Sequence, residues 1–172
     1  MGIKSIQIMS VVEKMSENSR VWIYQSNRQL STNEVETIKS KGDIFIKNWT
    51  SHEKRMNATI EVVQDVFVIV ALDESIAGAS GCGIDKLVKF MQVIGSELKI
   101  DFFNRLRIAY LNNEGKVDFF NASSIDVLME KGILNNDSII FCNHEVNNIN
   151  EMKTNWKQRI RESWLSHNYS AK

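Results

Sequence analysis

The sequence predicts an α+β protein, because strand-like and helix-like segments alternate along its first two thirds. Their order is strand, helix, strand, strand, helix, strand, which is the split β-α-β or ferredoxin-like (βαββαβ) arrangement. The run at 66–72 is apolar on both faces and is expected to be the central, covered strand. Apolar residues recur at helical spacing over 31–49 and 84–98. We therefore predict a ferredoxin-like core over residues 19–112.

The first half of this core has clear local signals. Residues 1–18 are mixed and are expected to form an amino-terminal arm, and the β-branched and aromatic run at 20–25 a first strand. Ser31 and Glu34 match a capping box, in which each side chain bonds the other residue's amide, so the first helix is expected to begin there. A polar loop at 50–55 should follow. The next strands are expected at 58–63 and 66–72.

A glycine-rich segment connects the central strand to the second helix. That helix should place one apolar stripe on the sheet over four turns. The stripe consists of Ile84, Leu87, Val88, Met91, Ile94 and Leu98. A fourth strand is expected at 106–111, which completes the core.

Residues 113–172 are expected to form a strand–helix–strand extension packed on the core, so that the chain is one domain overall. The pattern predicts strands at 116–120 and 138–142 with a short helix between them. A last helix is expected over 152–164, because Trp156, Ile160 and Trp164 recur every four residues. Its apolar face should dock on the body or on a second copy, so Trp156 and Trp164 are the residues through which a homo-oligomer would form.

Composition restricts the class of protein. The 172 residues suffice for one domain, and 43% hydrophobic with 24% charged residues is ordinary for a soluble one. A net charge of zero argues against a nucleic-acid partner. No apolar run approaches a membrane span and no secretory signal is evident, so no membrane partner is expected. Two cysteines are too few for a disulfide framework, which predicts reduced thiols and a cytoplasmic protein.

Two fragments imitate a nucleotide-hydrolysing protein. The run ending in Asp73-Glu74 is similar to a Walker B strand, and Gly78 to Gly83 have the glycine spacing of a P-loop. The next residues are Ile84 and Asp85, where a P-loop needs a lysine for the phosphates and a hydroxyl for magnesium. Lys86 comes two positions late. These departures exclude P-loop ATPase chemistry.

Over residues 20 to about 165 the chain resembles an uncharacterised bacterial family whose members often carry the label "ABC transporter ATPase". The matching segments are Val21-Trp-Ile-Tyr-Gln-Ser-Asn-Arg28, Trp49 with His52, Asp73-Glu-Ser with Gly78-Ala-Ser-Gly-Cys82 and Ile84-Asp-Lys86, and Asn155-Trp with Ser163-Trp164. The label coincides with the Walker-like fragments. The resemblance implies no established activity, and it transfers no catalytic residue to this chain.

The predicted site is the loop from Asp73 to Lys86. In the split plan the third strand runs antiparallel to the first two, so Asp73 should lie beside the loop that holds His52. A glycine-rich turn that enters a helix offers amides and a positive dipole end to a small anion. The ligand-binding residues of this hypothesis are Asp73, Glu74, Ser80, Gly81, Gly83, Asp85 and Lys86. The alternative is that the glycines only permit a tight reversal and that Asp85 satisfies the helix end.

A second hypothesis makes the protein a small cysteine-dependent enzyme. Cys82 would be the nucleophile at a helix amino terminus, where a thiol ionises more readily, and His52 would be its base. The alternative is a purely structural role, in which the small Cys82 thiol is buried for packing between Gly81 and Gly83. No metal site is predicted and the cofactor is unknown, since the histidines show no ligand spacing. The third hypothesis is a structural or protein-interaction role without a small ligand.

Overall fold

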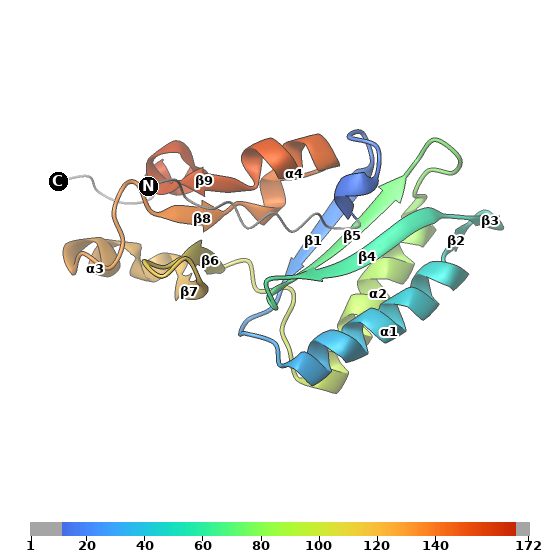
Figure 1. Ribbon diagram of the computed structural model, residues 1–172, viewed down its shortest axis with the longest axis horizontal. Coiled ribbons are helices and arrows are strands. Elements are labelled where there is room, and N and C mark those ends of the chain that lie inside the picture. The colour runs from blue at the N-terminus through green and yellow to red at the C-terminus, as the bar shows by residue number, and fades with distance from the viewer. Residues whose placement is uncertain (1–11, 168–172) are drawn as a thin grey trace.

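The computed structural model describes residues 12–167, which form a three-stranded and a four-stranded antiparallel sheet, a small two-stranded hairpin, and the helices that cover the sheets (Figure 1). Most of the predicted amino-terminal arm lies outside the described residues. Its described end holds the short 3-10 helix η1 (Val12–Lys14). No helix within 12–167 combines the length and the apolar character needed to cross a bilayer.

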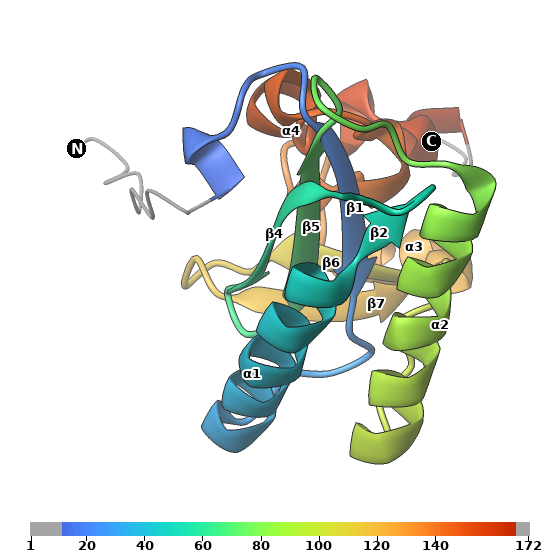
Figure 2. The same cartoon turned by 90° about the vertical axis from the view of Figure 1, so that its right-hand side faces the viewer.

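The first sheet contains β1 (Arg20–Gln25), β4 (Asn57–Val63) and β5 (Phe67–Asp73) in the order β1-β5-β4. Its central strand is β5, as the sequence predicted. Helices α1 (Thr32–Asn48) and α2 (Gly81–Leu98) lie on one side of this sheet, and α4 (Ile149–Asn155) lies on the other (Figures 1 and 2).

Burial on both faces explains why β5 is apolar throughout. Val68, Val70 and Leu72 pack in the cluster under α1 and α2. Phe67, Ile69 and Ala71 alternate with them and pack in a second cluster, which joins the sheet to the carboxyl-terminal half. Side chains alternate along a strand, so a strand covered on both faces must be apolar at every position.

The second sheet contains β6 (Arg107–Leu111), β7 (Val117–Asn121), β8 (Ile139–Phe141) and β9 (Lys157–Arg159). Their order is β7-β6-β8-β9. Strand β6, predicted as the fourth strand of the core, belongs to this sheet. It pairs with β7 on one edge and with β8 on the other, so neither edge is left for β1. The predicted boundary at 112 falls in the turn between β6 and β7.

The remaining elements are short. The polar loop predicted at 50–55 is a small hairpin, with β2 (Thr50–Ser51) paired to β3 (Lys54–Arg55). Helix α3 (Ile125–Glu130) lies where a short helix was predicted. The 3-10 turns are η2 (Ala122–Ser124), η3 (Asn143–Glu145), η4 (Ile160–Glu162) and η5 (Trp164–His167).

The prediction of a continuous helix over 152–164 is wrong. Helix α4 ends at Asn155, and the chain then turns into β9, which pairs with β8. The Trp156 carbonyl accepts the amide of Cys142 at 2.7 Å, which begins that pairing. The tryptophan spacing therefore reflects burial in two different clusters. Trp156 packs on the body of its own chain with only 8% of its surface exposed, which leaves little of it for a second copy.

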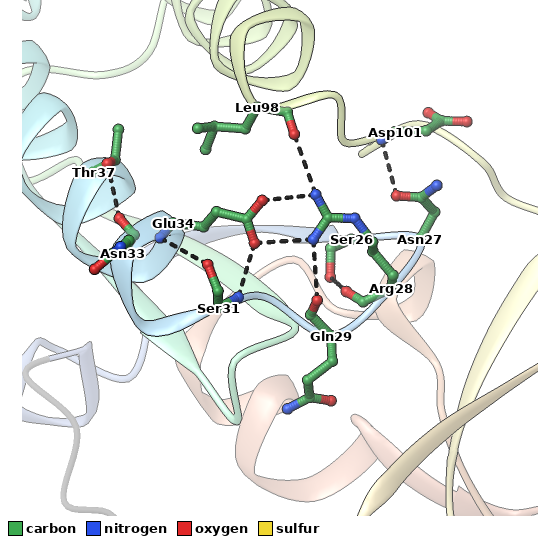
Figure 3. Close-up of polar contacts among 10 residues, drawn as sticks. All are labelled: Ser26, Asn27, Arg28, Gln29, Ser31, Asn33, Glu34, Thr37, Leu98 and Asp101. Carbon is green, nitrogen blue, oxygen red and sulfur yellow. Dashed lines mark hydrogen bonds and ion pairs between the residues drawn. The ribbon is translucent and has the colours of Figure 1, made fainter.

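A polar network fixes the loop between β1 and α1 (Figure 3). Ser31 and Glu34 form the predicted capping box at the start of α1. Arg28 donates to both carboxylate oxygens of Glu34, at 2.9 and 2.7 Å. It also donates to the carbonyl of Leu98 at the end of α2, at 3.2 Å. Through this arginine the loop holds the distal ends of both helices together.

We expect Glu34→Gln to lower stability at neutral pH by about 1 kcal/mol, the scale of an exposed ion pair with a cap. The Arg28 guanidinium, aided by the Ser31 amide, lowers the pKa of Glu34 to about 2. An unfolded glutamate titrates near 4.3. The contribution is therefore present above that pH and is lost as the pH falls toward 2. Urea unfolding from pH 7 to 2 should show a flatter acid slope for Glu34→Gln. Glu36→Gln on the same helix is the control, and an equal change in both variants would contradict the expectation.

Candidate functional site

The predicted glycine loop lies at the end of the first sheet where Asp73 leaves β5. Asp73 faces Asn57 across the ladder, with 3.4 Å between the Asn57 amide nitrogen and a carboxylate oxygen. The Ser51 hydroxyl donates to that of Ser80 at 2.7 Å, so the hairpin with His52 does adjoin the loop. The polar residues after Gln25 lie at the opposite end of the sheet, as expected.

Most amides of this loop are already hydrogen-bonded within the protein. The Ala79 amide donates to the Glu74 carboxylate at 3.0 Å, and the Gly83 amide donates to the Ser80 hydroxyl at 3.2 Å. Ser80 is thus the helix cap, in place of Asp85. The Ser75 amide donates to Asp73 and holds the pKa of that carboxyl below its usual value. Only the amides of Gly81 and Cys82 remain for an external anion at this helix end.

The charged residues of the loop do not converge on one point. Glu74 lies 3.8 Å from Arg20, and the Lys86 ammonium donates to the Thr50 carbonyl at 3.3 Å. Asp85 is exposed on the first turn of α2. A small anion in this loop would therefore have to compete with the Glu74 carboxylate for the Ala79 amide.

The two residues of the enzyme hypothesis are both at the surface. Cys82 is exposed, which is contrary to the expectation of a thiol buried for packing. His52 is exposed in the β2–β3 turn, where its φ is +49°. Within residues 12–167 no hydrogen bond joins them. The other thiol, Cys142, is buried, and its burial raises the pKa to about 12. The described residues also contain no group of three or more histidine, cysteine or carboxylate side chains suited to a metal ion.

A groove of about 540 Å³ lies along β1. All six residues of β1 line it, together with the connection that leads into β6 and the loop that contains η3. None of the predicted site residues lines it. This volume lies within the range of small-ligand sites, about 300–1,000 Å³. We define this hollow as the β1 groove.

Three arginines line the β1 groove: Arg20, Arg105 and Arg107. No aspartate or glutamate is among the described residues that line it. Arg105 is exposed, and neither it nor Arg107 has a carboxylate partner within 12–167. The Arg107 guanidinium lies 5.0 Å from the Phe119 ring, and its buried Nε has no acceptor among the described residues. Arg20 lies 3.8 Å from Glu74, so the positive charge of the groove comes mainly from Arg105 and Arg107, which stay charged at any physiological pH.

Aromatic side chains add to the groove wall. Trp22 and Tyr24 project from β1, and Phe103 approaches Tyr24 edge-on with ring centroids 5.8 Å apart. Phe103 is 45% exposed, which is unusual for a phenylalanine. Burial raises the pKa of Tyr24 to about 12, so its hydroxyl remains neutral. The groove can therefore offer apolar contact as well as positive charge.

Sequence reasoning missed the β1 groove because it made β6 the fourth strand of the ferredoxin-like core, which in that plan lies beside the first strand. In that arrangement the space beside β1 would be filled by a strand. One sequence feature could have indicated the groove. Arg105 and Arg107 lie at the start of a predicted strand, and no acidic residue occurs between positions 102 and 113 to neutralise them. Only the pairing of β6 with β7 and β8 places this pair beside an unfilled sheet edge.

Comparison of the chain with protein-family models, with curated proteins and with solved structures returned no match. The resemblance to the uncharacterised bacterial family stays a prediction.

Proposed function

We propose that this protein is a binding module that holds an anionic ligand in the β1 groove. The observation that carries the proposal is the set of three lining arginines without a lining carboxylate. Charged groups on a protein surface are usually interspersed, and a hollow with one sign of charge concentrates ligands of the opposite sign. Arginine also binds carboxylates and phosphates with two parallel hydrogen bonds.

The glycine loop supports an anion site less well than the groove. Its Glu74 carboxylate accepts from the Ala79 amide, which is one of the donors an external anion would need. A cysteine-dependent reaction would need a contact between Cys82 and a base. His52 lies exposed in the hairpin turn, and no hydrogen bond joins it to Cys82 within the described residues.

We also propose a cytoplasmic setting and a ferredoxin-like origin for the first sheet. The exposed free thiol of Cys82 supports a reducing compartment. The strand order β1-β5-β4, with both helices on one face, supports the split β-α-β plan over residues 20–98. In this proposal β6 belongs to the second sheet instead of pairing with β1. The binding groove occupies the place beside β1 where the fourth strand of a ferredoxin-like fold would lie.

Removing two of the arginine charges should weaken anion binding. Three fluorescent or calorimetric probes of different chemistry are suitable: labelled hexaglutamate, labelled hexathymidylate and inorganic tripolyphosphate. We expect at least one to bind saturably at low salt. The double variant Arg105→Gln/Arg107→Gln should raise its Kd by about tenfold or more, because each charge-assisted hydrogen bond contributes about 1.5–3 kcal/mol.

The matched control is Arg159→Gln/Arg161→Gln, which removes the same charge from outside the groove. These arginines lie near Asp137 and Glu162, at 2.9 Å for Arg161 and Asp137. The control should leave the Kd within about twofold of the native value. Equal weakening by the two double variants would show that only net charge matters. Failure of all three probes to bind would overturn the proposed function.

A further inference from the structure

Strand β1 has an open edge that faces the β1 groove. Its one neighbouring strand among the described residues is β5, and on the other side only an isolated bridge joins Arg20 to Asn148. Its backbone groups alternate in direction, and the Ser26 amide donates to the Val66 carbonyl on the β5 side at 2.9 Å. Val21, Ile23 and Gln25 therefore direct their amides and carbonyls away from β5. The groove floor is thus the hydrogen-bonding edge of a strand.

The two ends of this edge are closed by the protein itself. At one end the Val21 amide donates to the Asn147 carbonyl at 2.9 Å, and the Ile149 amide donates to the Ser19 carbonyl at 3.1 Å. At the other end the Gln25 side chain donates to the Arg107 carbonyl at 2.8 Å. Between these ends, the carbonyl of Val21, both backbone groups of Ile23 and the amide of Gln25 have no partner among the described residues. The open stretch suits about three residues of an added strand.

We infer that the β1 groove takes an extended acidic segment of a partner polypeptide, which adds as a strand to the edge of β1 beside Arg105 and Arg107. This inference rests on the proposed function and names the class of its ligand. Strand addition supplies affinity through backbone hydrogen bonds, and side-chain contacts supply the specificity. Here the carboxylates of the added strand would meet the arginines, and its apolar side chains would meet Trp22, Tyr24 and Phe103.

The charge of the groove argues against a second copy of this chain as the occupant. Two copies joined at β1 would bring two sets of arginines together, and like charges at an interface are unfavourable. The unpaired backbone edge also favours a polypeptide over a nucleic acid. A single-stranded nucleic acid binds by stacking its bases on aromatic rings. It does not form the regular hydrogen bonds that a strand edge of alternating amides and carbonyls offers.

The probe for the test is a labelled, terminally blocked hexapeptide of alternating valine and glutamate, with binding measured by fluorescence anisotropy. The Ile23→Pro variant removes one outward amide, and proline is tolerated on an edge strand where the lost amide does not face a neighbour. We expect it to raise the Kd by about tenfold or more. Ile23→Ala removes the side chain but keeps the amide, and it should stay within about threefold of the native Kd. A probe with lysine in place of glutamate should not bind.

A second measurement covers the case in which Ile23→Pro does not fold, as judged by its melting transition. The same hexapeptide N-methylated at every residue cannot donate to any strand edge, and it should lose binding to the native protein. Unchanged affinity of this probe would overturn strand addition. Loss of binding in Arg105→Gln/Arg107→Gln alone would show an anion groove without strand addition. Tight binding of hexathymidylate or tripolyphosphate, with none of the acidic peptide, would overturn the inference and leave the proposed function intact.

Discussion

Replacing Trp156 with alanine is expected to lower the free energy of unfolding by about 3–5 kcal/mol, the usual cost of truncating a buried tryptophan. The Trp156 ring lies 5.0 Å from that of Phe67 on β5 and 5.1 Å from that of Phe141 on β8. It therefore joins the two sheets. Its indole N–H also donates to the Asn143 side chain at 2.8 Å, and truncation would leave that acceptor unpaired.

Urea unfolding followed by far-ultraviolet circular dichroism measures the effect, since removal of a tryptophan alters the fluorescence signal itself. Trp164→Ala is the matched control. Trp164 is half-buried beside a separate apolar cluster that contains Ile140 and Leu165. It contacts His144 edge-on, with ring centroids 5.4 Å apart. Its truncation should cost clearly less. An equal cost for both variants, or none for Trp156→Ala, would mean that the junction of the sheets depends on other contacts.

The local elements of the first sheet could be predicted from the sequence because their signals are local. The strand predicted at 20–25 is β1 residue for residue, and the capping box of Ser31 and Glu34 begins α1 as expected. The fully apolar run after Val66 required a central strand, and β5 is one. Each of these inferences depends on residues that lie close together in the chain.

The partner of β6 could not be predicted in this way. Its alternation identifies a strand but does not say which edge it joins. A hairpin with β7 closes over a short turn at Asn112 and Gly115, while a pairing with β1 must close a loop of more than 80 residues. Loop closure costs less for the nearer partner. The prediction of a helix for the tail failed for a related reason. Trp156 and Trp164 have a helical spacing in the sequence, but they pack in different apolar clusters.

The site was predicted in the wrong place for the same reason, because the pairing of β6 could not be read from the sequence. The sequence directs attention to glycines, a cysteine and carboxylates, which is the composition of the loop at 73–86. The β1 groove consists of common residues, and it can be recognised only when β6 is known to leave one edge of β1 without a neighbouring strand. Arg107 is 82 residues from Gln25 at the end of β1, and Arg105 is only slightly nearer in the chain. Proximity of that kind is a property of the topology.

Replacing Trp49 with alanine should have an effect of similar size, about 3–5 kcal/mol, on the other side of the first sheet. Trp49 is 1% exposed and follows the last residue of α1. Its ring packs against those of Phe45 and Trp22, with centroids 5.4 and 5.9 Å away. Its indole N–H donates to the Gly83 carbonyl in the first turn of α2 at 2.9 Å. The side chain thus joins the two helices and positions the glycine loop.

The control is Trp49→Phe, which keeps an aromatic ring in the cluster and removes the hydrogen bond to Gly83. It should cost less than the alanine variant, and the difference between the two reports the packing contribution. Because Trp49 and Trp156 lie in separate clusters on opposite faces of β5, the double alanine variant should show additive losses. Their sum approaches the whole stability of a typical domain, about 5–15 kcal/mol, so the double variant should be largely unfolded at 37 °C. A double variant no less stable than either single one would contradict the separation of the two clusters by β5.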